Sequence, residues 1–234
     1  MPGRQLRSFM SIASASVCWS LIVLLLGAPG SAAPGAGGVP SLDGGDLAQG
    51  PYSLMHMMLK KTILRINVAT IDVRVDRQAQ LRFAELTRGK PFSDALADEL
   101  APVAIDAGRA TVQMRFNRNV SLDRWMGVVR DNLEQARRAG LIAGALEQQV
   151  SQGLPRWFGA LRERGYEEGD RLIYSVAPDG LRTVVVSSGG KVLLDRTDRQ
   201  LDGQPDLRRV VMASYFAPGS DFRQPLLRSL VESH

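Results

Sequence analysis

Two closely spaced hairpin turns constrain the fold of this chain more than any other feature. The stretch EGDRLIYSVAPDGLRTVVVSSGGKVLLDRT, residues 168–197, holds the turn sequences PDG (178–180) and SGG (188–190) between runs rich in Val, Leu, Ile and Thr. Tight hairpin turns require residues such as Gly and Asp, which tolerate the backbone conformations that reverse the chain. The stretch therefore predicts three strands in series, each antiparallel to the next.

Periodicity elsewhere predicts further strands joined by helices. KKTILRINVATIDVRVD (60–76) predicts one long strand, or two joined at a bulge, and RATVQMRFNRNV (109–120) alternates as a half-buried strand does. Helical patterns cover residues 77–88, 93–108, 121–139, 143–164, 206–216 and 220–231. Within the pattern at 143–164, a break is predicted at 153–155. This order predicts an α+β domain with a single, largely antiparallel sheet covered on one face by helices.

The N-terminal region has the pattern of an export signal. A basic start is followed by an almost wholly apolar run at 9–28 and by small residues at Ser31 and Ala33. The alternative is an uncleaved anchor, because about 20 apolar residues can span a bilayer. We therefore expect an exported protein, periplasmic or secreted, or one associated with a membrane through residues 9–28.

These patterns divide the chain into three parts. Residues 1–33 are predicted to be the signal peptide or N-terminal anchor. Residues 34–51 are half Gly and Pro, and they are expected to form a flexible linker because they cannot bury apolar surface. Residues 52–234 are predicted to form the folded domain.

Composition argues against several classes of function. The sole cysteine, Cys18, lies in the export segment, so neither a disulfide nor a catalytic thiol is expected in the domain. Without residues 1–33, which hold two arginines and no acid, the formal net charge falls from +5 to +3, and the basic residues are interspersed. Nucleic-acid binding is therefore not expected.

Motifs for the common enzyme chemistries are also missing. The only histidines are His56 and His234, and the chain contains no nucleophile-elbow, zinc-protease or phosphate-loop pattern. The Met and His residues of LMHMMLKK (54–61) supply at most two soft ligands on one strand face, too few for a copper site. We expect no cofactor and no metal.

One predicted helix carries an amide on its apolar face. In residues 121–139 an apolar stripe includes Trp125, and at 100° per residue Asn132 lies about 20° from it. A buried amide must be satisfied by backbone, by water or by a ligand, and the pattern leaves all three open.

Polar residues at nearby strand ends suggest a binding pocket. Arg115 and Arg118 end the strand that precedes this helix, and Arg65 and Asn67 share one face of the first strand. An apolar pocket with such groups at its mouth suits an amphiphile such as a fatty acid, because the planar guanidinium matches a carboxylate. The alternative is that these arginines are solvated strand ends.

The order of parts resembles the chalcone isomerase-like family. The resemblance covers roughly residues 55–231 and is carried by KKTILRINVATIDVRV, by the strand-to-helix sequence RFNRNVSLDRW, by GDRLIYSV and by PGSDFRQPLLRSLV near the end. It implies the open-faced sandwich of that family, in a bacterial, exported and non-catalytic branch.

The resemblance also implies where a ligand would bind. Plant enzymes of the family close a flavonoid ring in a cleft lined by an Arg, a Thr, a Tyr and an Asn. The Tyr falls on Trp125, the Asn on Asn132 and the Thr near Asn67, while residues 51–59 contain no Arg. Without the Arg and the phenol, stabilisation of negative charge on a reacting oxygen is lost. Other branches hold fatty acids without catalysis.

Together these patterns favour a binding protein for an apolar or amphipathic small molecule such as a fatty acid, and not an enzyme. The alternatives are an intramolecular lyase of chalcone isomerase type and a pocketless envelope interaction module. The predicted ligand-binding residues are Asn132, Trp125, Arg115, Arg118, Asn67 and Arg65.

Overall fold

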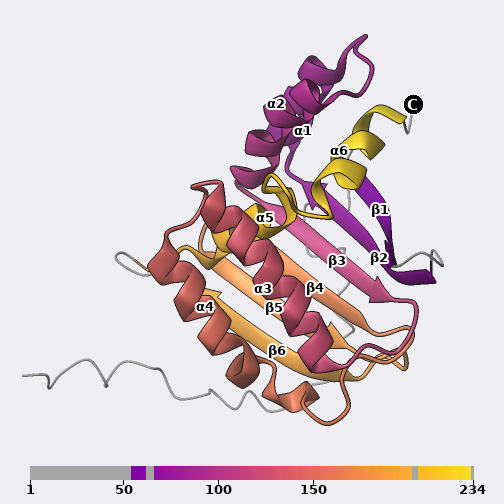
Figure 1. Ribbon diagram of the computed structural model, residues 1–234, viewed down its shortest axis with the longest axis vertical. Coiled ribbons are helices and arrows are strands. Elements are labelled where there is room, and N and C mark those ends of the chain that lie inside the picture. The colour runs from indigo at the N-terminus through magenta and orange to yellow at the C-terminus, as the bar shows by residue number, and fades with distance from the viewer. Residues whose placement is uncertain (1–53, 62–65, 202–204, 233–234) are drawn as a thin grey trace, which may run out of the picture. The chain divides into compact units, whose positions relative to one another are not determined.

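Six strands form one antiparallel sheet in the order of the sequence. The structure, a computed structural model, describes residues 54–61, 66–201 and 205–232. Every neighbouring pair of strands is antiparallel (Figure 1). The strands are β1 (Leu54–Lys61), β2 (Ile66–Val75), β3 (Ala110–Phe116), β4 (Arg171–Ala177), β5 (Gly180–Val186) and β6 (Val192–Arg199). The meander predicted from the two turn sequences is confirmed, whereas the predicted export segment (1–33) and linker (34–51) lie outside the described residues.

The N-terminal strand pattern is divided between two strands. The prediction of one strand over 60–76, or of two joined at a bulge, is wrong: residues 60–61 end β1, and β2 runs antiparallel to it from Ile66. A bulge does occur, but between Leu59 and Lys60 within β1. Both halves of a hairpin alternate with a period of two, so periodicity alone does not distinguish a hairpin from a continuous strand.

The helices cover one face of this sheet, as the sequence predicted. α3, α4, α5 and α6 lie over the strands, and α2 packs against α5 and α6 (Figure 1). The fold class is therefore confirmed as α+β with an open, single sheet. The helices are α1 (Arg77–Thr87), α2 (Asp94–Ile105), α3 (Leu122–Arg138), α4 (Gly144–Trp157), α5 (Leu207–Phe216) and α6 (Arg223–Glu232).

Helix starts follow the capping residues in the sequence. Ser93 and Ser121 each accept a hydrogen bond from a first-turn N–H, of Leu96 and Arg124 respectively, and so satisfy donors that have no partner within the helix. The break predicted at 153–155 is wrong, because α4 continues to Trp157 and only then gives way to the short 3-10 helix η2 (Gly159–Leu161).

The glycine in α4 has a packing role. A Cβ at Gly153 would overlap the ring of Trp157 one turn later, so the missing side chain lets this ring lie back along the helix. Gly153 therefore costs α4 some intrinsic stability but sets the position of a large aromatic side chain. That position becomes important for the cavity described below.

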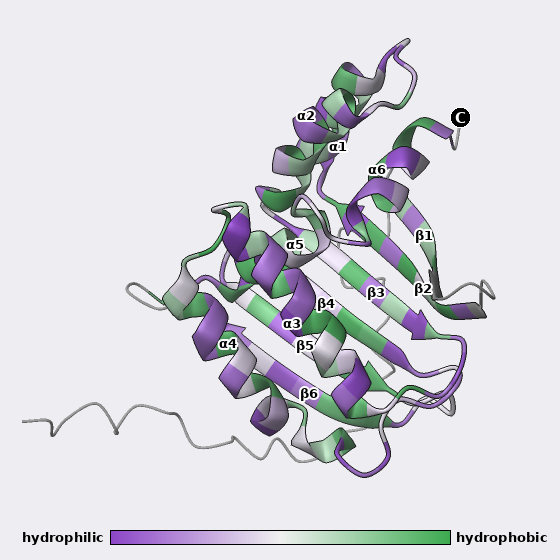
Figure 2. Cartoon of the chain, in the orientation of Figure 1, coloured by the Kyte–Doolittle hydropathy of each residue, from purple (hydrophilic) through white to green (hydrophobic). Residues whose placement is uncertain are grey.

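The main core lies between the sheet and the helices, and a second, small cluster of buried apolar side chains (Ile173, Val184 and Val186) lies on the other face of β4 and β5. Polar and apolar residues alternate along the strands (Figure 2). The residues that face the helices, such as Ile71, Val112 and Leu172, are fully buried. No helix formed by the described residues combines the length and the apolar character needed to cross a bilayer.

Candidate ligand-binding cavity

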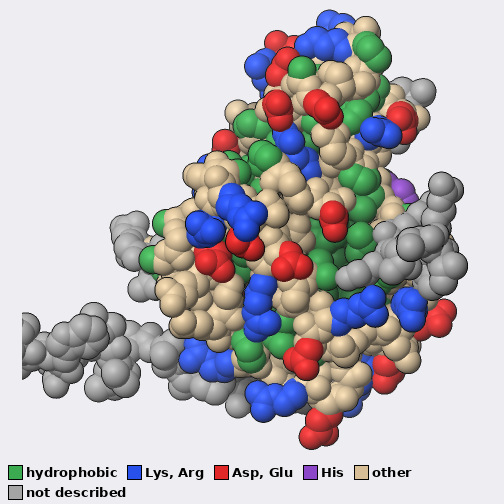
Figure 3. Space-filling view, viewed as in Figure 1, with side chains coloured by type: hydrophobic (Ala, Val, Ile, Leu, Met, Phe, Trp, Pro, Cys, Tyr) green, Lys and Arg blue, Asp and Glu red, His purple; other side chains and the backbone are tan. Residues whose placement is uncertain are grey.

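A cavity of about 120 Å³ lies between the sheet and α3, α4 and α5. Most of its lining is apolar, and in Figure 3 a recessed strip of hydrophobic side chains is visible beside α3. The cavity reaches the surface, since the exposed Arg124 is part of its lining. An engineered protein cavity of about 150 Å³ holds a benzene molecule, so this volume accommodates part of a small apolar ligand.

Aromatic side chains build the wall next to the start of α3. The helix begins after the Ser121 cap, and Trp125 near its start is buried, with 5% of its surface exposed. The centre of the Trp125 ring lies 4.5 Å from that of Phe158 and 5.5 Å from that of Tyr166. Tyr166 in turn stacks on Phe116, with 4.1 Å between the ring centres. Such pairs add stability beyond the area they bury and hold this wall in place.

Asn132 lies on the same helix and lines the cavity with 6% of its surface exposed. Its Nδ2 donates a hydrogen bond to the carbonyl oxygen of Val128, one turn earlier in α3, at 2.9 Å. Among the described residues the Oδ1 atom has no partner. The amide is therefore half satisfied by its own backbone, and its acceptor remains available to the cavity.

A polar row crosses the floor of the cavity. Tyr174, Thr183 and Arg196 occupy matching positions on β4, β5 and β6, so their side chains stand next to one another facing the helices. Tyr215 from α5 lines the same space. Within the described part of the chain, neither tyrosine hydroxyl nor the Thr183 hydroxyl has a hydrogen-bond partner.

Burial keeps both tyrosines of this group protonated. Removal from water raises the pKa of Tyr174 well above its ordinary value, with a further contribution from Tyr215 nearby. Burial likewise raises the pKa of Tyr215. At neutral pH each hydroxyl is therefore neutral and able both to donate and to accept a hydrogen bond.

Two arginines line the cavity, and they differ in what holds them. The Arg196 Nε donates to Asp198 Oδ1 at 3.0 Å, and its guanidinium lies 4.1 Å from the centre of the Trp157 ring. The Arg124 guanidinium has no partner among the described residues. Arg196 is therefore already engaged by Asp198 and Trp157, whereas Arg124 is available to an anion.

The structure brings together two of the residues proposed from the sequence. Trp125 and Asn132 both line the cavity. Arg115 is exposed on the other face of β3 from Phe116, because successive strand residues point to opposite sides. Arg118 is exposed in the connection between β3 and α3.

Of the other two proposed residues, only Asn67 belongs to the part of the chain that the structure describes. Asn67 is exposed near the start of β2 and does not line the cavity, and Arg65 lies outside the described residues. On the helix-free face of β1, His56 Nδ1 is 2.6 Å from Asp72 Oδ1. In the described ranges no three or more His, Cys, Asp or Glu side chains come together as a metal site.

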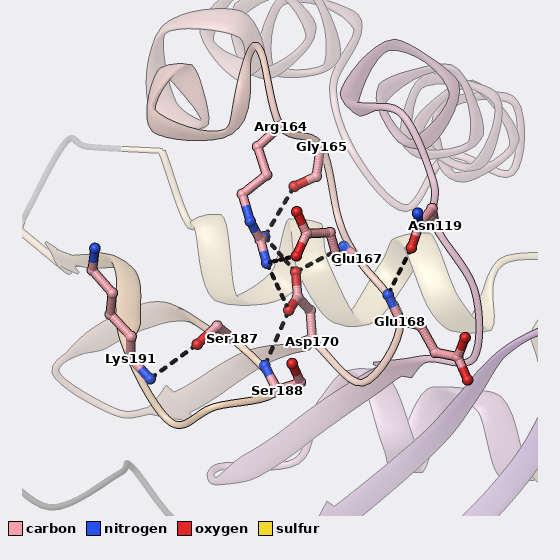
Figure 4. A network of polar contacts seen from close by, with 9 residues as sticks. All are labelled: Asn119, Arg164, Gly165, Glu167, Glu168, Asp170, Ser187, Ser188 and Lys191. Atoms are coloured by element: carbon pink, nitrogen blue, oxygen red, sulfur yellow. Dashed lines mark hydrogen bonds and ion pairs between the residues drawn. The ribbon is translucent and has the colours of Figure 1, made fainter.

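A buried carboxylate fixes the loop behind the aromatic wall. Asp170 is fully buried and accepts hydrogen bonds from Arg164 at 2.5 and 3.1 Å, from the N–H of Glu167 at 2.8 Å and from the N–H of Ser188 at 3.1 Å (Figure 4). It thereby joins the segment that carries Tyr166 to the turn between β5 and β6.

The Asp170 contacts also determine its protonation. Burial alone would raise the pKa of Asp170, but the hydrogen bonds from Arg164 and from the backbone outweigh this effect and hold the pKa below its usual value. The carboxylate is therefore ionised at neutral pH and can hold all four hydrogen bonds.

Replacing Asn132 with Leu is expected to raise the free energy of unfolding by up to about 1 kcal/mol, because an apolar group replaces a half-satisfied amide on an apolar wall. Chemical denaturation monitored by circular dichroism measures this change. A decrease in the free energy of unfolding by about 1 kcal/mol would instead mean that the hydrogen bond from Asn132 to the Val128 carbonyl stabilises the fold.

Comparison with known proteins identifies no family for this chain. No protein-family model matches it, and no curated protein matches it. Among solved structures it is similar to the crystal structure of an Arabidopsis thaliana fatty-acid binding protein, with a TM-score of 0.42 and 11% sequence identity, over 77% of this chain and 88% of the other. Similarity at that level carries no information about what this chain binds.

Proposed function

We propose that this protein binds an apolar or amphipathic small molecule, such as a fatty acid, in the cavity between the sheet and helices α3, α4 and α5. The observation that carries the proposal is the apolar cavity itself, with polar groups in its lining that no described residue satisfies. Apolar cavities with a few convergent polar groups are the usual form of small-molecule sites.

The cavity suits a ligand with one polar end. Arg124 lies where the cavity meets the surface and provides a cation without a partner, which fits a carboxylate. The apolar side chains of α3 and of the strands below it would surround the hydrocarbon part. We further propose that binding takes place outside the cytoplasm, on the basis of the basic, apolar and small-residue order of the first 33 residues.

Decanoate provides a direct test. Two of the three tryptophans, Trp125 and Trp157, line the cavity, so a full-length Trp19→Phe variant reports binding there through its intrinsic fluorescence. We expect saturable binding of one decanoate per chain. Val129→Phe fills the cavity from α3 and is expected to weaken binding at least tenfold.

A matched substitution separates cavity filling from general damage. Val103 is also a half-buried helical valine, but it lies in α2 away from the cavity lining, so Val103→Phe should retain decanoate binding. Equal losses in the two variants, or no binding to the parent protein, would overturn the proposed function.

A further inference from the structure

Four buried polar side chains face the cavity without full protein partners. The hydroxyls of Tyr174, Thr183 and Tyr215 and the Oδ1 atom of Asn132 have none among the described residues, and each of these residues is at least nine-tenths buried. The large majority of buried polar atoms in proteins are hydrogen-bonded. None of these four atoms is sealed off from the space around it, so their partner can come from the cavity, as water or as a ligand group that replaces it.

This group of side chains favours a neutral partner. Three hydroxyls and an amide carry no charge, and the adjacent Arg196 is already engaged by Asp198 and Trp157. A carboxylate placed here would meet the Asp198 carboxylate as well as the guanidinium, and its desolvation would be poorly compensated. A hydroxyl or carbonyl group can accept from these side chains at a much lower desolvation cost.

The available cation lies at a distance from this group. Arg124 and Asn132 are separated along α3 by about 12 Å, at about 1.5 Å per residue. That separation is close to the length of an extended ten-carbon chain. One ligand can therefore reach both positions, with its anionic end at Arg124 and its hydrocarbon part along the Trp125 wall.

Building on the proposed function, we propose that the cavity selects an amphiphile with a carboxylate at one end and a neutral hydroxyl or carbonyl group on its far, otherwise apolar part. The carboxylate binds at Arg124. The neutral group binds among Asn132, Tyr174, Thr183 and Tyr215, where it completes their hydrogen bonds. Hydroxy and oxo derivatives of medium-chain carboxylic acids have this chemistry.

Decanoate and 10-hydroxydecanoate form a matched pair for the test, because they differ only in the distal hydroxyl. We expect the full-length protein to bind 10-hydroxydecanoate about fivefold more tightly, which is the gain expected from one additional hydrogen bond to groups that otherwise lack one. Thr183→Val and Tyr215→Phe keep the shape of their side chains, and each should bring the ratio of the two affinities close to one. Arg124→Ala should weaken both ligands by a similar factor.

Other outcomes separate this inference from the proposed function. If decanoate binds and the distal hydroxyl gives no gain in affinity, the cavity interior offers that group no compensating hydrogen bond, and the inference fails while the binding function stands. A preference for the hydroxyl that persists in both Thr183→Val and Tyr215→Phe would also refute it. If neither compound binds, both the function and the inference fail.

Discussion

Replacing Asp170 with Ala is expected to lower the free energy of unfolding by about 3 kcal/mol. The substitution removes a fully buried carboxylate that holds Arg164 and leaves the N–H groups of Glu167 and Ser188 without an acceptor. Arg164 is 27% exposed and can turn toward water, which keeps the loss below that of a wholly buried pair. Chemical denaturation at pH 7 measures the difference.

An exposed ion pair between β5 and β6 provides the control. Arg182 and Asp195 are joined by two hydrogen bonds, at 3.0 and 2.7 Å, but their side chains are 48% and 42% exposed. Asp195→Ala is therefore expected to change stability by no more than about 1 kcal/mol. Similar losses in the two variants would show that burial and the backbone hydrogen bonds of Asp170 are unimportant.

The contribution of Asp170 also depends on pH in a defined direction. Its pKa in the folded protein lies below that of the unfolded chain, so its stabilisation is fully present above the unfolded value, about pH 4. It is lost as pH falls through the lower, folded value. The stability difference between the parent protein and Asp170→Ala should accordingly be constant near neutral pH and shrink in acid.

Replacing Gly165 with Ala is expected to cost about 3 kcal/mol. Its φ of +69° is unfavourable for any residue with a side chain, which alone costs roughly 1–2 kcal/mol. In addition, a Cβ would lie 2.6 Å from the carbonyl oxygen of Val120, and that oxygen already accepts a hydrogen bond from the N–H of Tyr166. Relief of the clash would displace the segment that positions the Tyr166 ring against Trp125.

Gly89 isolates the backbone component of this effect. Its φ of +67° is nearly the same, but nothing lies within 4 Å of a Cβ placed there. Gly89→Ala should therefore cost only about 1 kcal/mol. Thermal or chemical unfolding of the two variants compares them directly, and equal losses would show that the Val120 contact relaxes without cost.

The features predicted correctly from the sequence are those determined by local chemistry. The turns at 178–180 and 188–190 reverse the chain through their own residues, so the meander follows from short stretches of sequence. The helical period places Trp125 and Asn132 on one face of α3 without reference to any other element. Both residues line the cavity for this reason.

The features that sequence reasoning missed depend on the register between strands. Tyr174, Thr183 and Arg196 form one row only because β4, β5 and β6 have a particular register, and alternation alone does not distinguish registers that differ by two residues. Register also decides that Arg196 lies beside the cavity. Arg115 is a different case, because alternation with Met114 and Phe116 already indicated that it points to the opposite face.

The long connection between β3 and β4 has a consequence for the order of assembly. β4, β5 and β6 follow one another directly in the chain, α1 and α2 lie between β2 and β3, and the longer insertion of α3 and α4 separates Phe116 from Arg171. Contacts between neighbouring segments form with less loss of chain entropy than contacts across a long loop. The cavity straddles this junction, with Met114 on one side and Tyr174 on the other. The cavity therefore does not exist in either half alone, and a ligand bound in it would distinguish the completed fold from every partly assembled form of the chain.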